Sequence, residues 1–127
     1  MSSSSRIVQI PVDATTKTFF RKDLYAEIGR AGTPIAAYVA RYGEGFPMWD
    51  ELTAAVWLDP SLVKRSQKML EDVAVGDGAD YGSTLSWPIG RGPGLGEREV
   101  EVVQDVDVSR FERMTVKLLS ASRAPAY

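Results

Sequence analysis

The amino-acid sequence predicts an α/β protein in which helices come early and strands come late. Its 127 residues have the length of one domain, and 44% of them are hydrophobic and 25% charged, as in ordinary globular proteins. Helical spacing of apolar residues dominates from residue 21 to residue 58, and strand-like alternation dominates from residue 69 to residue 107. A free-standing domain of this order has a helix layer over a small, largely antiparallel sheet. The same order equally describes the trailing part of a larger α/β sheet whose parallel strands lie upstream.

The first half of the chain combines one predicted strand with three predicted helices. Pro11 places the strand at a sheet edge or near its own end, and the polar segment 13–18 is predicted as a turn. Thr33 is the expected N-cap of the second helix, and Pro34 follows at the first helical position. In that helix one apolar face consists of Ile35, Tyr38, Val39 and Tyr42. The expected elements are a strand over residues 6–12 and helices over residues 21–29, 34–42 and 47–58.

The second half of the chain is predicted as strands followed by one helix. Val100, Val102 and Val106 alternate with charged residues, as in a half-exposed strand. Ser109 and Glu112 have the spacing of a capping box and open the last helix. One face of that helix is expected to carry Phe111, Met114 and Leu118. The expected strands cover residues 69–75, 83–87 and 98–107.

Composition excludes several classes of chemistry. The chain contains no His, no Cys and no Asn, which excludes imidazole bases, thiol nucleophiles and His- or Cys-ligated zinc. The net charge of −2 and the isoelectric point near 5.2 provide no basic field for nucleic acid. The longest apolar run, Ala54–Leu58, is far too short to span a membrane, and the N-terminus lacks the apolar segment of a signal peptide. We therefore expect a soluble, cytoplasmic protein without nucleic-acid or membrane partners.

Two segments imitate ligand-binding loops. Glycines at positions 90, 92, 94 and 96 suggest a phosphate loop, but Leu95 interrupts the motif and the segment precedes a strand rather than a helix. We therefore interpret it as a hairpin loop. The acidic residues Asp72, Asp77 and Asp80 lack the oxygen spacing and the terminal glutamate of a calcium loop.

The segment Phe46–Leu52 is the strongest candidate for chemistry. As a structural element, Asp50 would complement the dipole of a helix start, and Trp49 would be a core aromatic residue. As a functional element, a carboxylate beside an indole at a helix N-terminus could line a cleft that grips a flat ring together with a cation or hydroxyl groups.

Several segments, in this order, resemble the C-terminal part of the inosine-uridine preferring nucleoside hydrolase family. Their ordered spacing is more specific than any single segment, and the resemblance extends from Ile7 to Leu119. The matching segments are Ile10–Thr15, Gly32–Ala36, Pro47–Leu52, Trp57–Val63 and Tyr81–Trp87.

This resemblance implies a site for a ribonucleoside. Such enzymes cleave the N-glycosidic bond with water and hold one calcium ion in an all-oxygen site at the carboxyl ends of a mostly parallel sheet. Asp50 matches the C-terminal calcium-ligand aspartate of the family. Trp49 stands where many members carry a histidine, and a tryptophan there is similar to the purine-preferring branch, in which the indole stacks on the base. Tyr38 and Tyr42 match tyrosines that lie near the base.

One part of the family pattern is missing. The N-terminal aspartate cluster, D-x-D-x-x-x-D-D, has no counterpart, because Asp13 stands alone and Asp105-Val106-Asp107 lacks the second pair. We therefore expect residues 1–127 to form a single partial domain, the C-terminal portion of a nucleoside-hydrolase-like open sheet. The expected function is that of the C-terminal part of a calcium-dependent, purine-leaning ribonucleoside hydrolase. This chain alone is expected to be inactive, and a homo-oligomer is a possible assembly. The alternative is a catalytically inactive remnant or an interaction module of the same fold.

Overall fold

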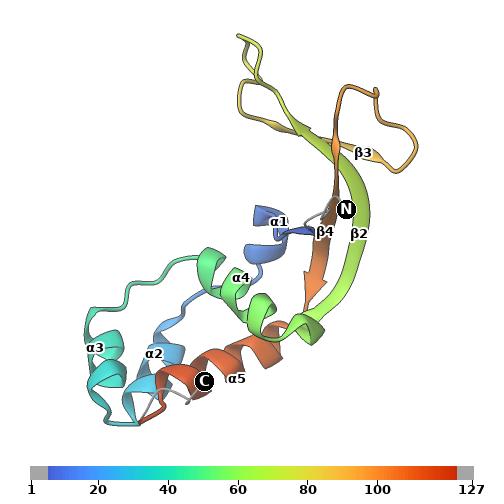
Figure 1. The fold of residues 1–127 in the computed structure, drawn as a ribbon. Coiled ribbons are helices and arrows are strands. Elements are labelled where there is room, and N and C mark those ends of the chain that lie inside the picture. The colour runs from blue at the N-terminus through green and yellow to red at the C-terminus, as the bar shows by residue number, and fades with distance from the viewer. Residues whose placement is uncertain (1–5, 123–127) are drawn as a thin grey trace.

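The computed structural model describes residues 6–122, and these form a helical body from which a twisted sheet extends (Figure 1). A 3-10 turn, Pro60–Leu62, links the fourth helix to the second strand. The helices are α1 (Val12–Thr15), α2 (Lys22–Gly29), α3 (Pro34–Tyr42), α4 (Trp49–Leu58) and α5 (Val108–Leu119). The strands are β1 (Ile7–Gln9), β2 (Val63–Val73), β3 (Thr84–Pro88) and β4 (Arg98–Val106).

The sheet is mixed, with the strand order β1-β4-β2-β3. β1 pairs with β4 in parallel, whereas β2 pairs with both β3 and β4 in antiparallel fashion. The predicted α/β class, with helices early and mixed or antiparallel strands late, is confirmed. β1 lies at one edge of the sheet, as the proline at its end predicted.

The second strand is longer than the sequence predicted. β2 begins at Val63 rather than at residue 69, because it pairs with β4 from the Val63–Val106 pair onward. The register shifts near Arg65, which interrupts the alternation of β4. As a result Val103 is fully buried and Val102 only partly buried, contrary to the predicted inward face.

The structure confirms one predicted helix boundary and differs from the sequence-based prediction at three other places. Thr33 caps α3 as predicted, because its hydroxyl accepts a hydrogen bond from the backbone N–H of Ala36 at 3.2 Å. Residues 12–15 form the short helix α1 where a turn was predicted, and α4 begins two residues after Pro47, which bridges to Phe19 in an extended conformation. The predicted capping box is wrong, since α5 starts earlier and Asp107 caps it.

The core lies between the helices and the adjoining ends of β2 and β4. α3 contributes Ala36 to this core, and of its predicted apolar face only Val39 packs against the core, since Ile35, Tyr38 and Tyr42 are all more than half exposed. Within residues 6–122, no helix is long and apolar enough to cross a membrane. The largest fully buried side chains are Phe111, Ile28, Met48, Leu52, Leu62, Val103 and Thr18.

Candidate functional site

Trp49 and Asp50 form the first turn of α4. Two fully buried neighbours, Met48 and Leu52, anchor this turn in the core and leave both candidate side chains at the surface. Trp49 is 51% exposed, so it is not a core aromatic residue. No hydrogen bond or ion pair within residues 6–122 engages the Asp50 carboxylate. The pair is therefore sterically available, with its carboxylate beside the positive end of a helix dipole.

The described residues do not form a calcium site by themselves. In residues 6–122 no group of three or more acidic, His or Cys side chains lies close enough together to hold a metal ion. Calcium takes six to eight oxygen ligands, whereas Asp50 offers at most two. The resident metal that the family resemblance implies therefore does not fit this set of residues alone.

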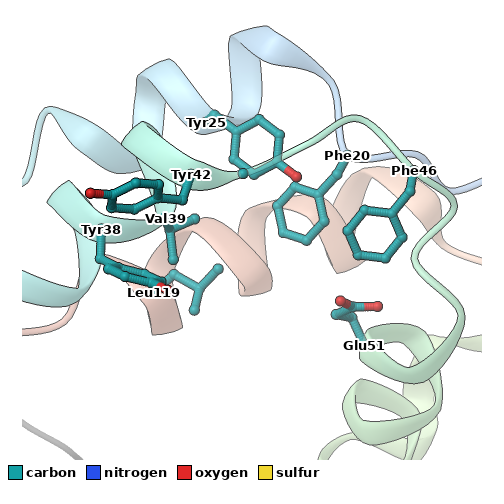
Figure 2. Close-up of a pocket in the computed structure, with 9 residues that line it drawn as sticks. Phe20, Tyr25, Tyr38, Val39, Tyr42, Phe46, Glu51 and Leu119 are labelled. Atoms are coloured by element: carbon teal, nitrogen blue, oxygen red, sulfur yellow. The ribbon is translucent and has the colours of Figure 1, made fainter.

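The two tyrosines predicted from the resemblance do line a pocket, of about 340 Å³ (Figure 2). Tyr38 and Tyr42 lie one helical turn apart on α3, with ring centroids 4.8 Å apart. The guanidinium of Arg41 lies 5.3 Å from the centroid of the Tyr42 ring. The other lining residues are Phe20, Tyr25, Val39, Gly43, Phe46, Glu51 and Leu119. Trp49 and Asp50 are not part of this lining, so the structure separates the predicted residues into two neighbouring groups.

A stacked aromatic cluster forms one wall of the pocket. The rings of Phe20 and Tyr25 are parallel to within 5° at 4.8 Å, and Phe46 lies 6.0 Å from Phe20. The hydroxyl of Tyr25 donates a hydrogen bond to the carbonyl oxygen of Glu44 at 2.6 Å. Burial raises the pKa of Tyr25, and the negative charges of Glu51 and Glu44 raise it further. The phenol therefore stays neutral at physiological pH.

Sequence reasoning missed Phe20, and it assigned no role to Phe46 and Glu51, although both lie in the candidate segment Phe46–Leu52. The two phenylalanines are distant in the chain, and they meet because the backbone N–H of Phe20 donates to the carbonyl of Phe46 at 2.9 Å. No periodicity links the two positions. Glu51 follows Asp50 directly, and only the direction of its side chain from α4 toward the pocket distinguishes it (Figure 2).

Three successive backbone amides of the glycine-rich loop are engaged by a carboxylate of the same loop. The Glu97 carboxylate accepts hydrogen bonds from the backbone N–H groups of Gly94, Leu95 and Gly96 at 2.7, 2.8 and 3.0 Å. Hydrogen bonds from backbone amides, its own amide foremost, hold the pKa of Glu97 below its usual range. The loop therefore closes on its own carboxylate between β3 and β4.

A second hollow, of about 420 Å³, lies beside the edge strand β1. Trp57 of α4 is 86% exposed at its rim. Val8 of β1 and Val63 of β2 contribute apolar side chains to the same hollow. An exposed indole beside an unpaired strand edge is a typical surface for association.

Comparison with known proteins identifies the fold. No family model matches the sequence, and no curated protein matches it. Among solved structures, a plant nucleoside hydrolase superposes with a TM-score of 0.79 at 19% identity, over 92% of this chain and 42% of that one.

Two bacterial structures match in the same way. A purine-preferring ribonucleoside hydrolase from Gardnerella vaginalis matches with a TM-score of 0.70 at 22% identity, over 91% of this chain and 40% of that one. An inosine-uridine preferring nucleoside hydrolase from Bacillus anthracis matches with a TM-score of 0.66 at 22% identity, over 93% and 37%. The chain thus spans well under half the length of each. At these identities the likeness concerns the fold, and the chain has the fold of one part of a nucleoside hydrolase.

Proposed function

We propose that this chain is the C-terminal part of a calcium-dependent ribonucleoside hydrolase, which cleaves the N-glycosidic bond of nucleosides to ribose and free base and leans toward purine nucleosides. The observation that carries the proposal is the Trp49–Asp50 pair, which projects from the first turn of α4 in a nucleoside-hydrolase fold. Residues 1–127 would then be a single partial domain rather than a complete catalytic unit.

Asp50 is the residue that this chain would contribute to calcium. The exposed position of its carboxylate and the absence of a side-chain partner in residues 6–122 support that role. The remaining oxygen ligands would have to come from other polypeptide, either an upstream segment or a second chain. The 127 residues alone should therefore bind calcium weakly and hydrolyse no nucleoside.

Trp49 is proposed to stack on the base. Its indole is 51% exposed, which leaves a flat apolar face for a purine ring. Tyr38 and Tyr42 line the pocket on the neighbouring helix and would lie near the same base. Because a purine offers a larger stacking surface than a pyrimidine, Trp49→Ala should weaken purine nucleosides more than uridine.

The decisive experiment assays inosine, guanosine and uridine with a polypeptide that contains this chain and supplies the missing ligands. Asp50→Ala should lower turnover on all three by about a hundredfold or more, since a displacement of about 1 Å in a catalytic arrangement has an effect of that order. Asp13→Ala removes another exposed first-turn carboxylate and is the matched control, with turnover expected unchanged. Near-normal turnover in Asp50→Ala would contradict the assignment.

An inactive remnant or interaction module is the second candidate. The exposed indole of Trp57 beside the edge strand β1 favours this reading. The coding region upstream discriminates the two candidates. An aspartate-rich D-x-D-x-x-x-D-D segment after an apolar strand would support the hydrolase, and its absence would support the remnant.

A further inference from the structure

The pocket beside α3 is lined mainly by aromatic and apolar side chains, together with the carboxylate of Glu51. Its lining contains four aromatic rings besides Tyr25, namely those of Phe20, Tyr38, Tyr42 and Phe46. Among the described residues 6–122, Glu51 is the one lining residue that carries a charge. A volume of about 340 Å³ is at the lower end of the range for small-molecule sites and accommodates a fused ring.

The charge around the pocket is negative. Glu44 lies close enough to Tyr25 to act on its pKa, and so does Glu51. The guanidinium of Arg41 lies over the Tyr42 ring, and Arg41 is not among the lining residues. Within residues 6–122, a phosphate group in the pocket would meet carboxylates with no Lys or Arg in the lining, so nucleotides should bind less well than nucleosides.

The acceptor oxygens of Glu51 have no partner within residues 6–122, where no hydrogen bond or ion pair engages them. Tyr25 does not satisfy them, because its hydroxyl donates to the carbonyl oxygen of Glu44. Figure 2 shows the carboxylate directed toward the rings of Phe20 and Phe46. A carboxylate that faces an aromatic wall is suited to a planar ligand with N–H donors in its plane.

We propose that Glu51 selects ligands that present two adjacent in-plane N–H groups, as guanine does with N1–H and its amino group, while the aromatic rings hold the plane of the base. This inference deepens the proposed function, on which it rests, by assigning a specificity residue and a preferred base. Hypoxanthine presents one of the two donors. Adenine presents a ring-nitrogen acceptor at the same edge, which faces the carboxylate unfavourably. The expected order of affinity is guanosine, then inosine, then adenosine.

The test is a calorimetric titration of the 127-residue chain, without metal, by guanosine, inosine, adenosine and guanosine 5′-phosphate. Hydrogen bonds to a charged group support about a tenfold preference for guanosine over adenosine. Glu51→Gln should remove that preference, because one of the two acceptor oxygens becomes a donor. Glu27→Gln, the same change on the exposed face of α2, should leave it intact. Circular dichroism and thermal unfolding establish that each variant is folded.

Two further measurements sharpen the result. Tyr38→Ala should weaken the nucleosides by similar factors, since stacking does not depend on the donor pattern. Benzamidine offers two adjacent N–H groups on a cation, and tighter binding of benzamidine than of guanosine would show selection for positive charge and overturn the guanine assignment. Equal affinity for guanosine and adenosine, or an unchanged preference in Glu51→Gln, would also overturn it.

The outcome is separable from that of the proposed function. Equal affinity of the unsubstituted chain for guanosine and adenosine, together with Asp50-dependent hydrolysis in a longer polypeptide, would reject only the role of Glu51. A guanosine preference that depends on Glu51, without any effect of Asp50→Ala on turnover, would reject the calcium role of Asp50 and retain the base site.

Discussion

Substitution of Gly43 by alanine should destabilise the protein through a single steric contact. A Cβ atom at Gly43 would overlap the ring of Tyr25, lying 2.5 Å from Cζ and 2.6 Å from Cδ1. The ring cannot move freely, because it stacks on Phe20 and its hydroxyl donates to the carbonyl oxygen of Glu44 at 2.6 Å. The backbone of Gly43 has φ −65° and ψ 132°, which any residue adopts, so no backbone strain contributes.

The magnitude follows from overpacking and from the hydrogen bond. Overpacking of a filled site lowers the free energy of unfolding by about 1–3 kcal/mol, and loss of the Tyr25 hydrogen bond adds about 1 kcal/mol. Restriction of the unfolded chain by alanine offsets about 0.4–1 kcal/mol. We therefore expect Gly43→Ala to lower the free energy of unfolding by about 1–3.5 kcal/mol, measured by urea denaturation with circular dichroism.

Two controls isolate the contact with the ring. Gly76→Ala adds the same methyl group where no atom lies within 4 Å, and its stability should be unchanged or slightly higher. In a Tyr25→Ala background the added methyl group at position 43 has no ring to displace, so its cost should largely disappear. A Gly43→Ala protein as stable as the wild type would refute the reasoning, and so would an equal cost in both backgrounds.

Three other predictions test separate features. The pKa of Glu97 is lowered from 4.5, so the carboxylate should order the glycine-rich loop fully above about pH 4.5, and this ordering should be lost as the pH falls through the folded-state pKa. Amide-exchange protection of the loop measures the ordering, and Glu97→Gln should abolish its pH dependence. Asp107→Ala should lower the free energy of unfolding by about 1 kcal/mol and Ser109→Ala by almost nothing, in urea titrations; equal effects would restore the predicted capping box. Trp57→Lys should reduce self-association, measured by sedimentation velocity, whereas Leu95→Lys, at a similarly exposed site away from the hollow beside β1, should not. Equal behaviour of the two variants would exclude this hollow as the surface through which the copies associate.

Local sequence signals determined the elements whose partners are near in the chain. Thr33 and Pro34 define a helix start through the N-cap hydrogen bond and the fixed φ of proline, and the structure contains that start. Pro11 indicated an edge strand or the end of a strand, because proline has no backbone N–H to donate to a ladder, and β1 lies at the edge. These features depend on interactions within a few residues, so a single sequence is sufficient to predict them.

Tertiary pairing decided the features that the sequence predicted wrongly. β2 begins at Val63 because β4 lies alongside it, and Val103 is buried because the ladder changes register near Arg65. The strand-like alternation of valines could not reveal a register shift, since the shift is produced by two strands and not by one. Asp107 similarly caps α5 because β4 ends beside the helix start, where both Asp107 and Ser109 are chemically suitable.

In the candidate site, too, some features follow from the sequence and others only from the tertiary structure. The sequence by itself determined that Trp49 and Asp50 occupy a helix start, because residue type and spacing specify the first turn of α4. Only the tertiary structure decided that Glu51 faces the aromatic pocket while Asp50 does not line it. Neighbouring residues on a helix point about 100° apart, so the packing of α4 against the body determines which carboxylate meets the rings.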